Sequence, residues 1–220
     1  MLGFPGAIRN DKKSVFSGNP VRNEIGQLDA PEKRYGARSK SGDEQLKLLV
    51  IGGSLGAHAL NAAVPQALQL IPQDRRPLVT HQAGAKHLDT LRQNYAAAGV
   101  AGELVAFIDD MAARYADCDL VICRAGALTV AELAAAGVAS ILVPFPYAVD
   151  DHQTSNAKFL SDQGAAVLLP QNELTPQGLA RLLTGLTREK LLAMAVKARA
   201  LAKPDATRLV AEACMEMAQA

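Results

Sequence analysis

The chain has 220 residues, of which 49% are apolar, and its 23 Lys and Arg side chains nearly balance its 22 Asp and Glu side chains. The near-zero net charge argues against a global attraction to nucleic acid or anionic lipid, so an anionic ligand must be held by a few placed groups. Aromatic residues make up only 4% of the chain and Trp is absent, which argues against a platform for stacking nucleic-acid bases.

Cysteine content and hydropathy indicate a reducing, aqueous compartment. Cys118, Cys123 and Cys214 lack the spacing of a zinc site, and we expect them to be small buried apolar residues. No apolar run approaches the length of a membrane span, and the N-terminus lacks the pattern of a signal peptide. We therefore expect a soluble, cytoplasmic protein.

In chain order, residues 1–45 are rich in Gly, Pro and polar residues and predict a linker with one short ordered piece, Val15 to Arg22. From Leu46 onward, short apolar runs alternate with helical patterns. The predicted strands are 46–51, 78–81, 104–108, 120–123, 140–143 and 165–169. The predicted helices are 54–71 (split by Pro65), 86–98, one from 110, 128–136, 152–163 and three segments after 175. This alternation predicts a doubly wound, Rossmann-like α/β domain with a parallel sheet, whose ligands bind beyond the carboxyl ends of the strands.

The first loop of interest follows the strand 46–51 and reads Gly52-Gly53-Ser54-Leu55-Gly56-Ala57. Its glycines let the backbone approach a ligand, and the next helix offers free N–H groups to a phosphate, with Ser54 as a further donor. A strand–helix turn capped by Ser54 explains the loop equally well. A dinucleotide fingerprint is rejected, because Ile51 stands where it needs Gly and the second strand ends in His81-Gln82 rather than in an acid.

A second loop, Arg124-Ala125-Gly126-Ala127-Leu128-Thr129-Val130-Ala131-Glu132, follows the strand 120–123. Gly126 frees the backbone, and the helix that begins there presents N–H groups to a second anion. Thr129 adds a hydroxyl, and Glu132 lies one turn further on the same face, where its carboxylate can accept hydrogen bonds from a ribose diol. The alternative is a capping-box pair of Thr129 with Glu132.

The third loop, 144–156, is too long for a minimal strand–helix connection. Gln153 and Asn156 lie on one face of the helix that follows, and such amides suit sugar hydroxyls. The alternative is that both residues only cap the helix and decorate its surface.

The fourth loop reads Phe107-Ile108-Asp109-Asp110-Met111. Its acids are predicted to be N-cap and first-turn residues of the next helix, and Ile108 can support a flat ring. Asp117 and Asp119 lie between a helix end and a buried strand, which argues against a metal site. The four histidines form no zinc pattern, and none pairs with a nucleophilic Ser or Cys.

Together these segments resemble the MurG family of glycosyltransferases over nearly the whole chain. The resemblance is carried, in the family's order and spacing, by Gly18-Asn19-Pro20-Val21-Arg22, Gly52-Gly53-Ser54-x-Gly56-Ala57, Phe107-Ile108-Asp109-Asp110-Met111, Arg124-x-Gly126-Ala127-Leu128-Thr129-Val130-x-Glu132, Val143-Pro144-Phe145, the 153–156 stretch and Pro204-Asp205-Ala206-Thr207. It implies a GT-B fold, of which this chain supplies the Rossmann-like C-terminal half that binds UDP-N-acetylglucosamine. The family transfers N-acetylglucosamine to a lipid-linked peptidoglycan precursor, converting lipid I to lipid II.

The resemblance also implies roles for individual residues. Arg22 and Ile108 border the uracil, Glu132 binds the ribose hydroxyls, and Gln153 and Asn156 read the sugar. Ser54 holds the diphosphate with the backbone of Ala127, Leu128 and Thr129, and Val130 and Ala131 complete this substrate-binding stretch. The phosphate loops contain Gly52, Gly53, Gly56 and Gly126. Neither a metal nor another cofactor is implied, because helix N-termini stabilise the departing UDP.

The resemblance further implies that the family's N-terminal domain is missing, with its acceptor loops, its catalytic base and most of its membrane contact. No catalytic residue is therefore expected in this chain. The expected division is 1–45 as a remnant of the missing domain plus linker, 46–203 as the UDP-sugar domain, and 204–220 as a helix reaching toward the missing domain. One departure from the family is Leu55, where Gln is common.

The expected partners are UDP-N-acetylglucosamine, the missing domain and, through that domain, lipid I, without nucleic acid. The expected location is the cytoplasm or the cytoplasmic face of the bacterial inner membrane, with peripheral contact only. We expect weak donor binding and no transfer by this chain alone. The alternatives are another UDP-sugar GT-B enzyme or epimerase domain, and a non-catalytic module that binds UDP-sugar.

Overall fold

The computed structural model describes residues 2–4, 15–40, 45–53, 57–148 and 151–219. Within these ranges the strands are β1 (Lys47–Ile51), β2 (Leu78–Gln82), β3 (Glu103–Val105), β4 (Leu120–Cys123), β5 (Ala139–Leu142) and β6 (Ala166–Leu168). The α-helices are α1 (Asn23–Gly26), α2 (Pro31–Lys40), α3 (His58–Gln69), α4 (Leu88–Ala98), α5 (Met111–Asp117), α6 (Ala127–Ala136), α7 (His152–Ser161), α8 (Pro176–Gly185), α9 (Arg188–Ala200) and α10 (Ala206–Gln219). The strands are parallel and pair in the order β3-β2-β1-β4-β5-β6, which confirms the predicted doubly wound, Rossmann-like α/β class.

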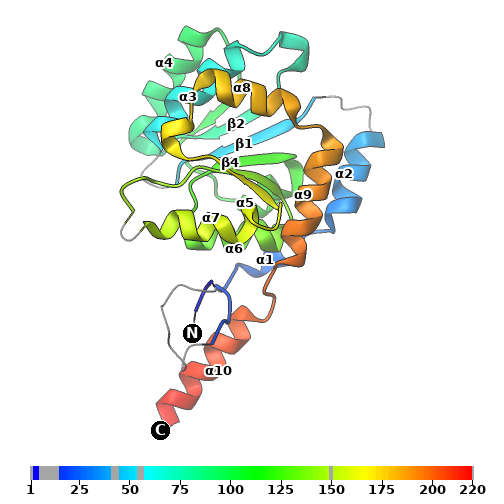
Figure 1. Cartoon of the computed structure of the whole chain (residues 1–220), viewed down its shortest axis with the longest axis vertical. Coiled ribbons are helices and arrows are strands. Elements are labelled where there is room, and N and C mark those ends of the chain that lie inside the picture. Colours follow the sequence, from blue (N-terminus) through cyan, green and yellow to red (C-terminus); the bar gives the residue numbers. More distant parts are fainter. Residues whose placement is uncertain (1, 5–14, 41–44, 54–56, 149–150, 220) are drawn as a thin grey trace.

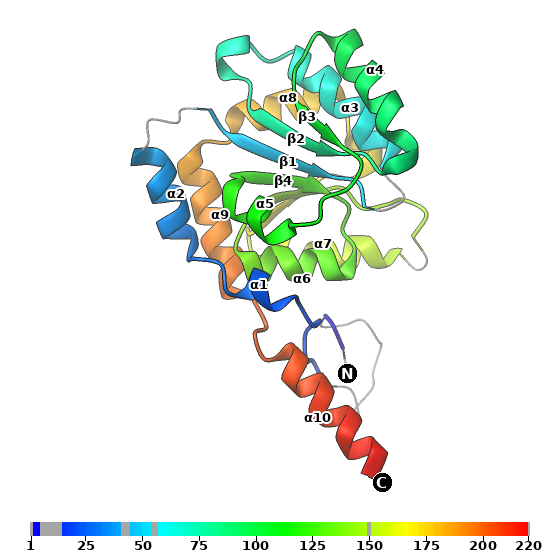
Figure 2. The same ribbon diagram turned by 180° about the vertical axis from the view of Figure 1, so that it is seen from behind.

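The sheet separates two hydrophobic cores, because successive side chains of a buried strand point to opposite faces. In β1, Leu48 and Val50 join the core formed with α3, α4 and α8, whereas Leu49 joins the core formed with α5, α6 and α7. These two groups of helices lie on opposite faces of the sheet (Figures 1 and 2). α2 and α9 lie side by side next to the amino ends of the strands, and α10 projects away from the sheet.

Several predicted boundaries and burial states are corrected by the structure. β3 is shorter than predicted, so Phe107 and Ile108 belong to the loop after it. α5 begins after Asp110, whose carboxylate accepts a hydrogen bond from the N–H of Ala113 at 2.9 Å, so the predicted N-cap is confirmed. The prediction of an acid in the first turn is wrong, because Asp109 lies before the N-cap. Cys118 and Cys123 are buried as expected, but Cys214 is exposed because it lies on the projecting α10.

The prediction that Pro65 splits its helix is wrong, because α3 runs without interruption from His58 to Gln69. A proline inside a helix leaves the carbonyl four residues earlier without its N–H donor. That carbonyl belongs to Asn61, and the side-chain amide of Asn94 on α4 donates to it at 3.0 Å. The neighbouring helix therefore supplies the missing hydrogen bond, and the expected break is avoided.

The prediction of a linker before residue 46 is wrong for α2, a ten-residue helix that begins with Pro31 at a position where proline is favoured. Its buried side chains bond to distant backbone groups. The Arg34 guanidinium donates to the carbonyls of Tyr115, Ala136 and Gly137, at 2.8, 2.6 and 2.7 Å. The Tyr35 hydroxyl donates to the carbonyl of Asp119 at 2.6 Å. This helix is therefore an integral part of the domain.

We predict that the buried imidazole of His81 makes the fold sensitive to acid. Its ring nitrogens lie 3.1 Å from the Tyr95 hydroxyl and 3.0 Å from Asn61 Oδ1, an arrangement that suits the neutral ring. Burial lowers the His81 pKa from 6.5 to about 3. Below pH 6.5 the unfolded chain binds a proton that the folded chain excludes, so stability falls as the pH drops from about 6.5 toward 3.

Urea unfolding between pH 7.5 and 4.5 measures this effect. The wild-type free energy of unfolding should fall by about 1 kcal/mol more per pH unit below 6.5 than that of His81→Gln. The same substitution at His58, on the exposed start of α3, is the control and should keep the wild-type pH dependence. Equal slopes for wild type and His81→Gln would contradict the prediction.

A second prediction concerns the hydrogen bond that compensates for Pro65. Asn94→Ala removes the side-chain donor to the Asn61 carbonyl and should lower the free energy of unfolding by about 1–2 kcal/mol. In a Pro65→Ala background the restored backbone N–H can donate to the same carbonyl, so Asn94→Ala should cost less. Urea unfolding of the four proteins gives the coupling energy. A coupling of zero would show that the two positions act independently.

Candidate functional site

A cleft of about 210 Å³ lies between the carboxyl ends of β1 and β2 on one side and α6 on the other. The strand order reverses between β1 and β4, and doubly wound sheets bind ligands at such a reversal because the flanking loops diverge there. The cleft brings together five residues predicted for the site, namely Arg22, Gly53, Ile108, Thr129 and Glu132. Ser54 and Gly56, both predicted to hold phosphate, lie outside the described residues.

Glu132 is the carboxylate at the centre of this cleft, and both of its oxygens have partners. Oε1 accepts from Arg22 Nε at 3.2 Å and Nη2 at 3.0 Å, and Oε2 accepts from the Tyr115 hydroxyl at 3.2 Å. The N-cap of α6 is Gly126, and no side chain caps this helix. The alternative interpretation of Thr129 and Glu132 as a capping box is therefore wrong, and both side chains line the cleft.

The first turn of α6 reaches the same cleft through Thr129, which lines it. Gly126 has extended backbone angles, and the nearest heavy atom to a side chain added there is Thr129 Oγ1 at 3.6 Å. The N–H groups at the start of a helix lack intrahelical acceptors, so this turn can bind an anion. Val130 does not share this role: its side chain is buried in the core and its N–H donates to the Gly126 carbonyl. Leu128 is exposed at the rim, and Ala127 and Ala131 are half-buried.

The glycine turn after β1 is held by Gln82, a residue that sequence reasoning did not select. The Gln82 side-chain oxygen accepts from the N–H groups of Gly52 and Gly53, at 3.2 and 3.1 Å. Its side-chain nitrogen donates to the carbonyls of Gly53 and Ala106, at 3.1 and 2.9 Å. The two N–H groups predicted to meet a phosphate therefore already have an acceptor within the protein. The sequence signal that could have indicated this role is the polar residue Gln82 at the carboxyl end of β2.

The two residues predicted to read a sugar do not line the cleft. Gln153 accepts from the N–H of Phe145 at 2.9 Å through its side-chain oxygen, which ties α7 to the preceding loop. Asn156 is buried and donates to the Ala125 carbonyl at 3.1 Å. Arg124 fixes the same loop from the other side, because its guanidinium lies over the Phe145 ring and donates to the Val143 and Pro144 carbonyls.

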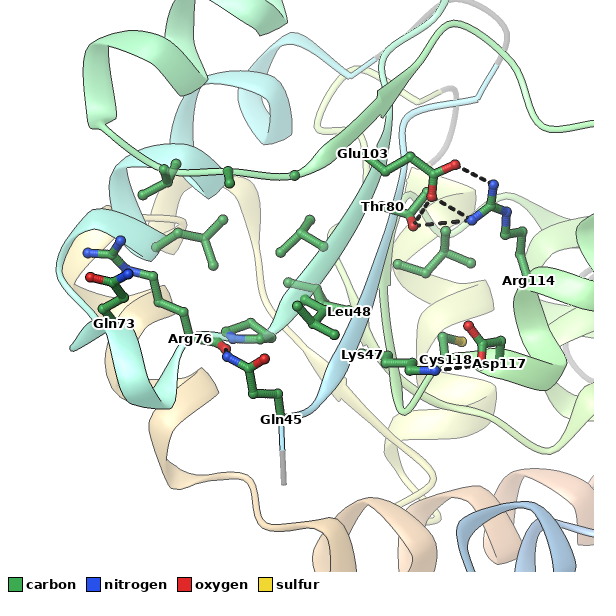
Figure 3. A pocket seen from close by; sticks show the side chains of 18 of the residues that line it. Gln45, Lys47, Leu48, Gln73, Arg76, Thr80, Glu103, Arg114, Asp117 and Cys118 are labelled. Atoms are coloured by element: carbon green, nitrogen blue, oxygen red, sulfur yellow. Dashed lines mark hydrogen bonds and ion pairs between the residues drawn. The ribbon is translucent and has the colours of Figure 1, made fainter. Parts of the chain in front are cut away.

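A larger cavity of about 670 Å³ lies at the opposite, amino-terminal edge of β1, β2 and β3 (Figure 3). Its polar side chains bond to one another: Arg114 pairs with Glu103, which also accepts from Thr80, and Lys47 pairs with Asp117. The hydrogen bond from Arg114 lowers the pKa of the Glu103 carboxyl. The charged groups of this cavity are paired with each other, and it lies away from the carboxyl ends of the strands, so we take the smaller cleft as the site.

The acids around β4 have structural partners. Asp119 is fully buried and forms ion pairs with Arg38 and Arg188. Across the ranges that the structure describes, no group of three or more His, Cys, Asp or Glu side chains is arranged to hold a metal ion. In those same ranges no helix has the length and apolar character needed to cross a bilayer.

Comparison with known proteins shows the family of this chain. The model of the glycosyltransferase family 28 C-terminal domain matches residues 47–210. A UDP-N-acetylglucosamine–N-acetylmuramyl-(pentapeptide) pyrophosphoryl-undecaprenol N-acetylglucosamine transferase of Nitrosospira multiformis is 68% identical over 99% of this chain and 60% of its own length. The protein of the same name from Cupriavidus metallidurans is 62% identical over 99% of this chain and 59% of its own. The chain thus spans about 60% of the length of these relatives.

Solved structures agree with the sequence comparison. MurG of Acinetobacter baumannii shares 41% identity and superposes with a TM-score of 0.80, covering 94% of this chain and 58% of that one. Anabaena HepE, solved with UDP and glucose, shares 17% identity with a TM-score of 0.58 over 91% of this chain and 56% of its own, which shows a common fold only. These matches confirm the family resemblance and the GT-B half predicted from the motifs.

We predict that Gln82 stabilises the wall of the cleft. Gln82→Leu keeps the size of the side chain but removes its hydrogen bonds to the glycine turn and to Ala106. The free energy of unfolding should fall by about 1–3 kcal/mol, because these backbone groups lose their partners. Urea unfolding measures the change, with Gln66→Leu on the exposed face of α3 as the control. A loss no larger than that of the control would contradict the prediction.

Proposed function

The chain belongs to glycosyltransferase family 28 and contains that family's C-terminal domain, and from this premise we propose that it is the donor-binding half of a transferase that uses UDP-N-acetylglucosamine. We assign the acceptor to the lipid-linked peptidoglycan precursors, because the relatives are named as transferases to N-acetylmuramyl-(pentapeptide) pyrophosphoryl-undecaprenol. The proposed reaction converts lipid I to lipid II.

The observation that carries the proposal is that Glu132 and Thr129, which lies in the first turn of α6, line one cleft. A carboxylate repels phosphate but accepts two hydrogen bonds from a ribose diol, and a helix N-terminus attracts a diphosphate. Their separation by one helical turn suits two neighbouring parts of one nucleotide. In our proposal Arg22 and Ile108, which line the same cleft, border the uracil, and Gln153 and Asn156 adjoin the sugar from α7.

The proposed chemistry is an inverting transfer. The acceptor hydroxyl oxygen bonds to the anomeric carbon of the sugar, the bond from that carbon to the β-phosphate oxygen breaks, and a general base takes the hydroxyl proton. The N-terminus of α6 stabilises the negative charge on the departing UDP, so the chain's own dipoles supply what a metal ion supplies elsewhere. We place the base on the N-terminal portion that the longer relatives have, and we propose that this chain alone binds the donor and transfers nothing.

We also propose that the region 46–203, together with α2 packed against it, is the nucleotide-binding unit, and that the residues before α1 and the segment 204–220 meet the N-terminal portion. In support, α10 projects from the domain beside the described N-terminal residues (Figure 2). Its side chains Met215 and Met217 are 56% and 73% exposed and are therefore accessible to a neighbouring surface. The membrane-embedded acceptor is reached through the N-terminal portion, as a peripheral contact at the cytoplasmic face of the inner membrane.

Calorimetric titration tests the donor assignment. The chain should bind UDP-N-acetylglucosamine in preference to UDP-glucose and should not bind NADH. Glu132→Gln should weaken UDP-N-acetylglucosamine binding by about 10- to 100-fold, because a hydrogen bond to a charged group contributes about 1.5–3 kcal/mol. Glu173→Gln, at an exposed position of the Gln171–Glu173 turn, is the control and should bind like wild type.

The outcomes separate the competing functions. Equal binding of UDP-glucose favours another UDP-sugar enzyme of the same fold, whereas selective binding with no transfer after the N-terminal portion is added favours a non-catalytic module. A folded chain that binds no UDP-sugar, either alone or with the N-terminal portion, would overturn the proposal.

A further inference from the structure

The two oxygens of the Glu132 carboxylate have partners of different character. Oε1 accepts from the guanidinium of Arg22, and Oε2 accepts from the hydroxyl of Tyr115 on α5. The Arg22 side chain is 45% exposed and belongs to the segment that leads into α1. Tyr115 is 1% exposed and packs in the core between α5 and α6. One partner is thus solvent-accessible, and the other is fixed inside the domain.

Tyr115 is anchored at its backbone as well as at its ring. Its carbonyl accepts from the buried guanidinium of Arg34, which also donates to the last carbonyls of α6 at Ala136 and Gly137. Arg34 therefore ties α5, which carries Tyr115, to α6, which carries Glu132. The phenol and the carboxylate are held in register by a hydrogen bond at one end and by this arginine at the other.

A diol is recognised well only when the carboxylate plane is fixed. The terminal torsion of a Glu side chain is broad, so a carboxylate without a fixed partner samples many orientations. Two neighbouring ribose hydroxyls need both oxygens presented together, and ordering the side chain at the moment of binding lowers affinity. Burial raises the pKa of Tyr115 well above its ordinary value, so its hydroxyl remains a donor at neutral pH.

We infer that Tyr115 is a positioning residue for nucleotide recognition: its buried hydroxyl holds the Glu132 carboxylate in the orientation that receives the ribose diol. The inference rests on the proposed function, in which Glu132 binds the ribose. In this inference Tyr115 acts on the ligand only through Glu132, so its effect on affinity requires a ligand with ribose hydroxyls. The contribution of the Tyr115 hydroxyl must depend on the ribose hydroxyls.

The test compares two probes, UDP and its 2′,3′-dideoxy analogue, by calorimetry on the full 220-residue chain. Tyr115→Phe keeps the ring and removes the hydroxyl. It should weaken UDP binding by about 5- to 10-fold, the loss of one hydrogen bond. The affinity for the dideoxy analogue should stay the same, which also shows that the variant is folded. In a Glu132→Gln background, Tyr115→Phe should not change the affinity for UDP relative to the affinity for the dideoxy analogue.

Tyr95→Phe is the matched control. Tyr95 is also buried, and its hydroxyl is also hydrogen-bonded, to His81, but it belongs to the other core of the domain. This variant should bind both nucleotides like wild type. An equal loss for both nucleotides in Tyr115→Phe, or no loss for either, would overturn the inference.

Failure of the proposed function has a different signature. If the folded wild type binds neither UDP nor the dideoxy analogue, the proposed function fails. If it binds both equally well, Glu132 does not recognise the ribose, and the inference fails while donor binding stands. If wild type prefers UDP and Glu132→Gln abolishes that preference, the ribose contact is supported and Tyr115→Phe alone decides the inference.

Discussion

The buried carboxylate of Asp119 is the constraint on which the arrangement of this domain depends. A charge in a protein interior is tolerated only when opposite charges and hydrogen-bond donors surround it. Arg38 of α2 and Arg188 of α9 form ion pairs with it, and the backbone N–H of Lys47 donates to it at 2.8 Å. The start of β4, the start of β1 and two helices therefore converge on one side chain. Their relative positions are fixed at the amino-terminal edge of the sheet.

That edge is linked to the cleft at the opposite edge by α2. On this helix Arg38 reaches Asp119, and Arg34, one turn earlier, reaches the carbonyl of Tyr115 and the last carbonyls of α6. Tyr115 in turn bonds to Glu132, which lines the cleft. A helix with few apolar residues thus orients the carboxylate of the site, although it contributes nothing to the cleft itself.

The sequence predicts the parts of this structure that depend on local pattern. Apolar runs locate the strands, the loops after them locate the cleft, and Asp110 marks the start of α5. It does not predict α2, because Arg34 and Tyr35 find their partners 81 and 84 residues away in the chain. The continuity of α3 depends in the same way on Asn94, which lies 33 residues beyond the carbonyl it satisfies. When the partner of a residue is distant in sequence, the local sequence pattern does not distinguish that residue from an ordinary surface or core residue. Its role becomes visible only in the folded structure.

The two sides of the cleft differ in how many of their polar groups are already hydrogen-bonded within the protein, and this difference bears on which part of a ligand each side can bind. On the β1 side Gln82 already satisfies the N–H groups of Gly52 and Gly53, so among the described groups the first turn of α6 is the stronger candidate for a diphosphate. Toward α7 the amides of Gln153 and Asn156 are hydrogen-bonded to backbone groups of the domain. The described groups therefore suit the nucleotide better than the sugar or the acceptor.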